Sequence, residues 1–547
     1  MSNCYIKRRQ IRFKRGTTTL SLLRAHTKDY RRFIVCKINN KLSDLHQKIK
    51  NGDRITALDI GDSEGFRCYQ NSLSLLLSAV VAECLPGKKL IIEHSFGDGF
   101  FCKFDNGCSV RKQEFTRISR MMKQKIRDAI PFEKIQKSKM SIIRNFIKRE
   151  NFEKVQLLRY QKGKTIDIYT CGTYSDITFT PLVPDTSYLD KSSLLFYKPG
   201  FVLRFPTPEL RKVLPLFQDP KKLFSIFEEY ERWGEILDIS DIVPLNRRIE
   251  KGEISDVIKI AEALHEKKIA QIADKIRKKD KNLKIVLIAG PSASGKTTFS
   301  KRLAIQLRVN CLSPLTLSID NYFHERGKTP KLPDGSYDYE SINAIDVKLL
   351  NKHLLKLLEG KEIQIPHFEF ATGKRVRGKR LRMHKNQILL IEGIHGLNER
   401  LTHQVPGKNK LKIYISTLTQ LNIDSNHRIS TRDTRILRRM VRDSLFRNHS
   451  AHETFRLWEH VQKGEDRNIF PYQEEADIMF NSALVYELSV LKGFAVPLLR
   501  TVRMNRKNYS KSERLLKFLS FFLKISPAEV PPTSILREFI GGSSFLY

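Results

Sequence analysis

Short apolar runs in the second half of the chain alternate with stretches that have helical spacing. Leu283–Ala289 is almost wholly apolar and is followed by a helix pattern over Phe299–Leu307. Leu315–Asp320 and Gln387–Gly393 repeat the apolar run, and each carries a carboxylate at its end. Short apolar runs bounded by polar residues are typical of strands that are buried on both faces of a parallel sheet. The pattern predicts an α/β domain whose parallel sheet is flanked by helices.

The first half of the chain has a mixed pattern. Phe33–Ile38 is typical of a strand, Asn39-Asn40 of a turn, and Leu42–Ile49 of a short helix. Further along, Leu73–Cys84 has the apolar content of a buried helix, and several strand-like runs follow it. We therefore expect separate α+β modules ahead of the α/β domain.

Two helix patterns connect and extend these parts. Ile254–Lys281 is charged but has helical apolar spacing, and Leu515–Lys524 is an apolar helix near the C-terminus. The changes of pattern divide the chain into a basic N-terminal arm over 1–32, a small β/α unit over 33–61, a mixed α+β domain over 62–245, a helical linker over 246–282, the α/β domain over 283–503 and a helical tail over 504–547.

The charge balance is strongly basic. The chain of 547 residues has 98 Lys and Arg against 59 Asp and Glu, a formal net charge of +39. A charge of this size favours polyanions, either nucleic acid or nucleotide phosphates, but it also fits basic surfaces that are only solvated. The first acidic residue is Asp29. The basic arm before it is typical either of a segment that contacts RNA or of a targeting segment.

Cysteine spacing and hydropathy indicate the compartment. None of the eight cysteines forms a C-x-x-C pair, so we expect no structural zinc site, and free thiols favour a reducing cytoplasm. No apolar run reaches the roughly 18 residues of a membrane-spanning helix. We therefore expect a cytoplasmic protein without a membrane partner, and the oligomeric state stays open.

A phosphate-binding motif directly follows the first apolar run. The residues between that strand and the next helix match G-x-x-x-x-G-K-[ST] in full. Glycines let backbone N–H groups converge on phosphate oxygens, and the next helix directs its positive N-terminal end at them. We predict that ATP binds to Gly290, Pro291, Ser292, Ala293, Ser294, Gly295, Lys296, Thr297 and Thr298.

Carboxylates at strand ends and arginines on a later helix complete the predicted site. Glu392 is expected to bind Mg²⁺ together with Thr297. Asp320 is placed to accept a proton from an attacking hydroxyl, or to act as a second Mg²⁺ ligand. Arg439, Arg442 and Arg447 are spaced on a helix that would close over the transferred phosphate, where charge needs stabilising. We predict catalytic roles for Lys296, Asp320, Arg439 and Arg442, and ATP binding by Arg447.

These motifs together resemble the uridine kinase and phosphoribulokinase family. The segment after the phosphate motif appears as Asp320-Asn321-Tyr322-Phe323, and two further segments appear as Tyr337-Asp338 and Pro366–Arg375. The resemblance covers about 220 residues and implies a P-loop kinase fold and transfer of the ATP γ-phosphate to the 5′-hydroxyl of a uridine- or cytidine-type nucleoside. It implies that substrate binds to Asp320, Tyr322, Asp338, Phe368, Phe370, Arg375 and Arg439.

Three positions depart from the family pattern. Gly373 stands where the family has the histidine that reads the base, Phe368 replaces a tyrosine, and His449 replaces a further arginine. A pocket that loses polar groups discriminates less well between bases. A kinase for another small alcohol or a sugar phosphate therefore stays open as an alternative.

The first half resembles the front end of threonyl-tRNA synthetases. Val35–Ile60 is similar to their TGS domain, a β-grasp module, and Tyr69–Phe104 to their editing domain. The paired histidines of the editing site fall on Asn71 and Leu75, which cannot replace imidazoles, so we expect no hydrolytic editing. The whole order, through to the tail segment Arg537–Gly542, resembles the longer bacterial uridine kinase-like proteins.

Two function classes compete. The first is an ATP- and Mg²⁺-dependent phosphotransferase with an alcohol acceptor. The second is an RNA-associated regulatory protein that uses ATP as a switch, for which the basic N-terminal half would contact RNA with strong salt dependence. A GTPase is disfavoured because no N-K-x-D motif follows the phosphate motif. The true acceptor, feedback regulation and the role of the editing-like domain are not determined by the sequence.

Overall fold

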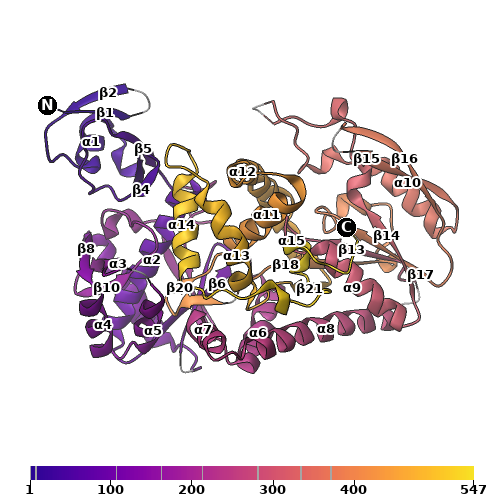
Figure 1. Cartoon of the computed structure of the whole chain (residues 1–547), viewed down its shortest axis with the longest axis horizontal. Coiled ribbons are helices and arrows are strands. Elements are labelled where there is room, and N and C mark those ends of the chain that lie inside the picture. The colour runs from indigo at the N-terminus through magenta and orange to yellow at the C-terminus, as the bar shows by residue number, and fades with distance from the viewer. Residues whose placement is uncertain are drawn as a thin grey trace.

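The structure is a computed structural model, and it describes residues 2–6, 9–105, 107–161, 163–211, 213–279, 282–332, 335–369, 372–419 and 421–546. Figure 1 shows a small module at the N-terminus, a second module below it, and the α/β domain at the opposite end of the long axis. The long helix α8 (Ile254–Lys278) runs along the lower edge and connects the halves. The helix expected over Ile254–Lys281 is confirmed, but it ends at Lys278.

The N-terminal module is a five-stranded mixed sheet in the order β2-β1-β5-β3-β4, as expected of a β-grasp module. Asn39 and Asn40 both have positive φ, 52° and 65°, and form the two-residue turn of the β3–β4 hairpin. The elements are β1 (Ser2–Ile6), β2 (Arg9–Phe13), α1 (Thr19–His26), β3 (Val35–Ile38), β4 (Lys41–Ser43) and β5 (Arg54–Leu58), with a 3₁₀ turn over Tyr30–Arg32.

Two expectations for this module were wrong. Residues 1–32 are not an arm apart from the unit over 33–61, because β1 pairs with β5 in parallel and with β2 in antiparallel register. The hairpin was hidden in the sequence because β2 lies at the sheet edge and is mostly exposed, so its apolar alternation is weak. The helix expected over Leu42–Ile49 is absent from these described residues, since Leu42 pairs with Lys37 in strand β4.

The second module contains two antiparallel sheets, β10-β9-β8 and β11-β12-β7-β6, around one buried helix. That helix, α2 (Ser63–Cys84), includes the apolar run Leu73–Cys84 and confirms it as a buried helix. The other elements are β6 (Leu90–Phe96), β7 (Gly99–Phe104), α3 (Lys112–Arg127), β8 (Phe132–Ser138), α4 (Lys139–Lys148), α5 (Phe152–Tyr160), β9 (Thr165–Cys171), β10 (Tyr174–Ile177), a 3₁₀ turn over Thr186–Leu189, β11 (Ser193–Tyr197) and β12 (Gly200–Arg204).

The α/β domain has a five-stranded, all-parallel sheet in the order β14-β17-β13-β18-β21. This confirms the predicted fold class. Its central strand β13 is buried along its whole length, as the apolar run required. The elements from the connection onwards are α6 (Lys221–Leu237), α7 (Ile242–Glu250), α8, β13 (Ile285–Ala289), α9 (Lys296–Val309), β14 (Ser313–Ser318), α10 (Val347–Leu358), β15 (Ile363–Glu369), β16 (Lys374–Leu381), β17 (Gln387–Glu392) and β18 (Lys410–Ser416).

The rest of the domain and the tail follow. They comprise β19 (Asn422–Asp424), β20 (His427–Arg428), α11 (Thr431–Arg447), α12 (Ala451–Asn468), β21 (Ile478–Asn481), α13 (Glu487–Arg500), α14 (Tyr509–Ser520) and α15 (Arg537–Ile540). Short 3₁₀ turns lie over Ile319–Tyr322, Arg326–Lys328, Ile342–Ala344, Glu399–Thr402, Gly407–Asn409, Phe470–Glu475 and Pro527–Glu529.

The tail is integrated into the α/β domain rather than appended to it. Leu515 and Phe539 are fully buried in the same core cluster as Val286 of β13 and Phe299 of α9. The helix expected over Leu515–Lys524 is present but begins earlier and ends earlier, at Ser520. Burial of this extent means that the segment over 504–547 contributes to the stability of the domain.

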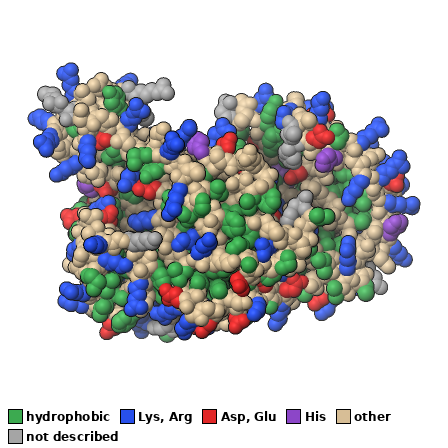
Figure 2. Space-filling view, viewed as in Figure 1, with side chains coloured by type: hydrophobic (Ala, Val, Ile, Leu, Met, Phe, Trp, Pro, Cys, Tyr) green, Lys and Arg blue, Asp and Glu red, His purple; other side chains and the backbone are tan. Residues whose placement is uncertain are grey.

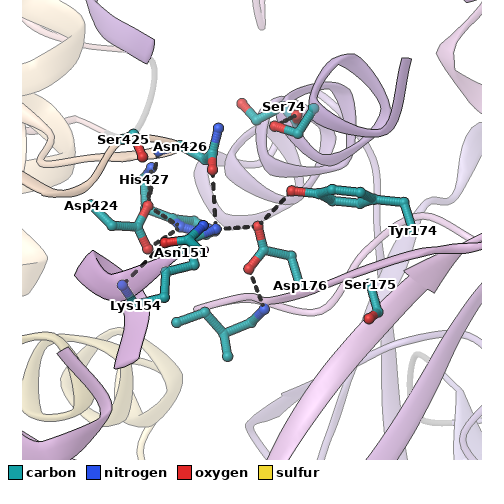
Figure 3. A network of polar contacts seen from close by, with 12 residues as sticks. Ser74, Asn151, Lys154, Tyr174, Ser175, Asp176, Asp424, Ser425, Asn426 and His427 are labelled. Atoms are coloured by element: carbon teal, nitrogen blue, oxygen red, sulfur yellow. Dashed lines mark hydrogen bonds and ion pairs between the residues drawn. The ribbon is translucent and has the colours of Figure 1, made fainter. Parts of the chain in front are cut away.

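A buried polar network joins the two halves of the chain (Figure 3). Lys154 of α5 pairs with Asp176 of β10, and its ammonium donates to Asn426 Oδ1 at 3.0 Å. Asn426 lies in the turn of the β19–β20 hairpin of the α/β domain, beside Asp424, which accepts from His427 Nδ1 at 2.8 Å. The hairpin thus reaches into the second module and binds a fully buried lysine there.

The charge distribution of the surface and the apolar character of the helices can both be described. Figure 2 shows Lys and Arg side chains spread over most of the visible face, with many on the N-terminal module, rather than gathered in one stripe. Across the described parts of the chain, no helix combines the length and the apolar character needed to cross a membrane.

Candidate active site

The phosphate motif forms the loop between β13 and α9, at the carboxyl edge of the parallel sheet. Gly290 has no space for a side chain, because a Cβ there would lie 2.0 Å from the carbonyl oxygen of Ile415. Gly295 has a φ of 83° and precedes the first helical residue, Lys296. The motif therefore brings its backbone N–H groups to the N-terminus of a 14-residue helix, a site suited to anions.

The ammonium of Lys296 lies inside this loop. Its Nζ donates to the carbonyl oxygen of Pro291 at 3.1 Å. Enclosure by protein lowers the pKa of Lys296, and the carboxylates of Glu392, Glu538 and Asp320 oppose this only in part. The charged form of an enclosed lysine that lacks a matched ion-pair partner is stabilised when an anion binds beside it.

Thr297 and Glu392 form the candidate metal site. Thr297 Oγ1 donates to Glu392 Oε2 at 3.1 Å across the carboxyl ends of the sheet. Burial raises the pKa of Glu392, whereas Lys296 lowers it. A hydroxyl beside a carboxylate is an oxygen-only donor set, which fits Mg²⁺, an ion that keeps several waters and takes few protein ligands. The described residues contain no group of three or more His, Cys, Asp or Glu that could hold a metal ion.

Asp320 lies in the 3₁₀ turn that directly follows β14. Its side chain is exposed to solvent, although protein atoms surround the carboxylate. This desolvation raises the pKa of Asp320, while Lys296 and Arg447 act in the opposite direction. A carboxylate with a raised pKa is a better proton acceptor than an ordinary aspartate.

Helix α11 supplies a cluster of arginines around one buried carboxylate. Arg439, Arg442 and Arg447 all contact Asp443, which is fully buried, at 3.1, 3.5 and 3.2 Å. Arg439 also donates to Ser292 Oγ of the phosphate loop at 2.9 Å. The structure thus brings the three predicted arginines beside the loop, and Asp443 holds them there.

Two further arginines of α11 were missed by sequence reasoning. Arg435 donates to the carbonyl oxygen of Ser292 at 2.8 Å, and Arg438 donates to that of Ser482 at 2.8 Å. Both are fully buried. Each lies four residues before a predicted arginine, Arg435 before Arg439 and Arg438 before Arg442, and this spacing was the available signal, because such positions share one face of a helix.

Carboxylates from distant parts of the chain occupy donors of the phosphate loop. Glu465 of α12 accepts from the backbone N–H of Ser292 at 2.8 Å. Glu538 of α15 accepts from the backbone N–H and the hydroxyl of Thr298 at 3.2 and 2.7 Å. These are donors of the kind that the motif offers to phosphate oxygens. Sequence reasoning gave no signal for either glutamate, since neither is close to the motif in the chain.

Some of the predicted substrate residues are buried in the core, and others are ion-paired or partly exposed. Tyr322 and Phe368 are buried in a core cluster around the β15–β16 hairpin, and the hydroxyl of Tyr322 contacts His353 Nδ1 at 3.1 Å rather than facing the phosphate loop. Arg375 is bound to Asp346 at 3.1 Å. Asp338 lies in the loop before α10 and is partly exposed. Phe370 lies outside the described residues.

The position of the missing histidine is already filled. Gly373 has a φ of 70°, and a Cβ there would lie 2.3–2.4 Å from the side chain of Arg326. Arg326 also donates its backbone N–H to the carbonyl oxygen of Gly373 at 3.1 Å. A histidine at position 373 would therefore require Arg326 to move.

Glu340 is a further acidic group that sequence reasoning missed. Glu340 packs against Gly464, and a Cβ added at Gly464 would lie 2.3 Å from the Cβ of Glu340. Burial, together with Glu465, raises the pKa of Glu340 to about 7, and Arg439 opposes this. The site therefore holds more carboxylate than the sequence motifs indicated.

The residues at the predicted editing positions pack within the second module. Asn71 donates to Thr180 Oγ1 at 2.7 Å, and Leu75 is buried in the core of the second module. Burial raises the pKa of the Cys171 thiol to about 11, so no thiolate is available near neutral pH. The expected loss of hydrolytic editing stays a prediction.

Comparison with known proteins divides the chain in the same way. Residues 285–489 match the model of the Phosphoribulokinase / Uridine kinase family. The uridine kinase of Saccharomyces cerevisiae is 28% identical over 203 residues, which are 36% of this chain and 36% of that protein. The N-terminal half matches a threonine–tRNA ligase of Desulforamulus reducens, 27% identical over 182 residues, 33% of this chain and 29% of the relative. The chain thus spans under two fifths of either relative.

Solved structures include a possible uridine kinase from Bacillus stearothermophilus. It is 16% identical, the match covers 39% of this chain and 97% of that chain, and the TM-score is 0.27.

Proposed function

Because residues 285–489 form a domain of the phosphoribulokinase and uridine kinase family, we propose that this chain transfers the γ-phosphate of ATP to a hydroxyl of a small acceptor. The first candidate acceptor is the 5′-hydroxyl of a uridine- or cytidine-type nucleoside. The observation that carries the proposal is the convergence of Lys296, Asp320, Glu392 and the α11 arginines on one phosphate loop. Phosphoryl transfer depends mainly on positioning and charge stabilisation, which this set supplies.

Each group has a proposed part in the reaction. The loop N–H groups and Lys296 bind the phosphates, and Arg439, Arg442 and Arg447 stabilise charge on the transferred group. The acceptor oxygen attacks the γ-phosphorus, the bond to the β-phosphate oxygen breaks, and ADP leaves. Asp320 takes the proton from the acceptor hydroxyl. Mg²⁺ held by Thr297 and Glu392 would neutralise phosphate charge.

The identity of the acceptor rests on the Gly373 position. Arg326 lies where the family's base-reading side chain would project, so we propose that this guanidinium takes part in recognising the acceptor. Guanidinium binds carboxylate and phosphate oxygens well, and it also donates to carbonyl oxygens of a pyrimidine ring. A sugar phosphate is the alternative acceptor that the same group favours.

The N-terminal modules are proposed to be a TGS-like and a degenerate editing-like domain. Their similarity to threonyl-tRNA synthetases and the net charge of +39 support a contact with RNA. The scattered distribution of Lys and Arg in Figure 2 gives this contact less support than the phosphate loop gives to kinase activity.

The test is ATP consumption by the purified full-length chain with uridine, cytidine, other nucleosides and ribulose 5-phosphate. Asp320→Asn should abolish turnover, and Asp256→Asn on an exposed face of α8 is the matched control. Turnover with one acceptor that is lost only in Asp320→Asn supports the proposal and names the acceptor. A folded protein that binds ATP but turns over none of these acceptors contradicts it, and salt-dependent RNA binding would then support the regulatory class.

A further inference from the structure

A cavity of about 440 Å³ lies where the second module, helices α6 and α8 and the α/β domain meet. It is separate from the phosphate loop and from the residues predicted to bind ATP, metal or substrate. Its apolar lining comes from all three parts, including Ile91 of β6, Trp233 of α6 and Leu264 of α8. A cavity of this volume is within the range of small-molecule sites, which are often found where domains meet.

Aromatic rings form one side of this cavity. The His94 ring stacks on Phe227 with centroids 3.5 Å apart and planes 12° apart. Trp233 lies 3.9 Å from the ring of Tyr230 and 5.8 Å from that of His265, centroid to centroid. Among these five lining residues Trp233 alone is partly exposed. A planar ligand would find an indole face at the entrance and further rings behind it.

Two buried imidazoles in the lining have unused hydrogen-bonding capacity. His265 Nε2 contacts the carbonyl oxygen of Ala483 at 3.2 Å and must carry the proton to donate to it. His265 Nδ1 is then an acceptor, and it is buried without a protein partner, as is His94 Nε2. Burial lowers the pKa of both imidazoles, so both are neutral. Buried polar atoms without partners are uncommon in folded proteins and call for an explanation.

The entrance to the cavity is acidic, in contrast to the chain as a whole. Acidic residues at the edge are Glu93, Asp105, Glu231, Glu235 and Asp238. Lys103 is paired with Glu93 at 2.6 Å and also with Glu231, Lys89 lies 3.5 Å from Asp105, and Arg248 lies 3.6 Å from Asp238. Five carboxylates thus face three cations. An acidic rim repels phosphate, attracts cationic groups and does not repel neutral ones. In a chain of net charge +39, this local excess of acid singles out the site.

We propose that this cavity binds a small planar heteroaromatic amine without a phosphate group, a nucleobase or a nucleoside. The rings provide stacking, the free imidazole nitrogens provide partners for ring N–H or amino groups, and the rim excludes nucleotides. This assigns a second ligand site to the junction of the two halves, in addition to the proposed phosphotransfer site.

The cavity and the phosphate loop share one wall. Asn481 and Ala483 at the end of β21 line the cavity. Ser482, between them, faces the other way, donating to the carbonyl oxygen of Ser294 at 2.5 Å and accepting from Arg438 at 3.2 Å. The two sites are therefore adjacent but lie on opposite sides of the same segment, and they can be observed independently.

The two tryptophans of the chain provide a separate reporter for each site. Trp233 lines the cavity, whereas Trp458 lies under the guanidinium groups of Arg435 and Arg439, 5.1 and 5.9 Å away, beside the phosphate loop. Trp458→Phe leaves the cavity reporter, and Trp233→Phe leaves the loop reporter. Each full-length variant is titrated with adenosine, cytidine, adenine and the two nucleoside 5′-monophosphates, with a saturating non-hydrolysable ATP analogue that fills the phosphate loop without phosphoryl transfer.

We expect a saturable change of Trp233 emission with a nucleoside or base, and binding of the matching monophosphate weaker by about tenfold or more. The Trp458 signal should not follow the same curve. The double variant Glu231→Gln, Glu235→Gln, which changes exposed residues only, should reduce the difference between nucleoside and monophosphate. Absence of any saturable Trp233 response up to millimolar concentrations, or equal binding of the monophosphate, would overturn the proposal.

Discussion

Two enclosed lysines show how differently the two polar centres of this protein are built. Lys154, in the network of Figure 3, is buried, but Asp176 and Asp424 more than offset the burial, so the pKa of Lys154 is raised. At the phosphate loop burial dominates instead, and the pKa of Lys296 is lowered. A cation with matched partners braces a structure, whereas an under-compensated one is ready to receive an anion.

The first prediction concerns the polar network around Lys154. Lys154→Met leaves Asp176 as a buried carboxylate without its cation and removes one of the two groups that lower the pKa of Asp424, so the free energy of unfolding should fall by about 3–5 kcal/mol. Denaturant unfolding measures this, and Lys148→Met on the exposed face of α4 is the control. ATP turnover per folded molecule should be unchanged. A stable Lys154→Met protein would show that the network contributes no net stability.

The second prediction breaks the other centre. Lys296→Met should reduce kcat/KM for ATP by about 10²–10³-fold, the cost of removing one group that stabilises developing charge. The midpoint of thermal unfolding should stay the same or rise, because the lost charge was poorly compensated. Lys348→Met on an exposed position of α10 is the matched control. If Lys296→Met lowers stability and leaves activity unchanged, Lys296 has a structural role like that of Lys154.

The third prediction sharpens the contrast by removing a negative charge from the loop. Glu538 accepts from two donors of Thr298, where phosphate oxygens would bind, and it helps to keep Lys296 charged. Glu538→Gln should therefore tighten ATP binding by about five- to tenfold, since like charges no longer oppose each other. Calorimetric titration with ATP measures this, with Glu529→Gln in the exposed part of the tail as control. Weaker binding would mean that Glu538 organises the loop instead.

The fourth prediction has the smallest effect and concerns pH. Desolvation raises the pKa of Asp320, so the acidic limb of the rate profile should lie above the ordinary aspartate value of about 4. The brace responds in the opposite sense. Although Asp424 is buried, His427 and Lys154 lower its pKa, so its contribution to stability is present above about pH 4 and is lost as pH falls further. Rate profiles and unfolding midpoints measured between about pH 3 and pH 8 separate the titration of Asp320 from that of Asp424.

Sequence reasoning worked best where chemistry is encoded by neighbouring residues. The loop over 290–297, the strand ending at Glu392 and the buried run of β13 are local features, so the parallel sheet and the loop at its edge were predictable. It failed for the hairpin β1–β2, whose exposed edge strand hides the alternation that marks a strand. The contact between Tyr322 and the substrate stays a prediction, and packing turns the Tyr322 hydroxyl towards His353.

The sequence by itself determined the fold class of the second half and the place of the phosphate loop, because backbone dihedrals and apolar periodicity act over short stretches. Only the tertiary structure decided which distant charges meet. Glu465 and Glu538 reach the loop, and Asn426 reaches Lys154, from positions 173, 240 and 272 residues away. Such pairs depend on how separate elements pack, and desolvation at the meeting point then fixes whether a charge braces the protein or awaits a ligand.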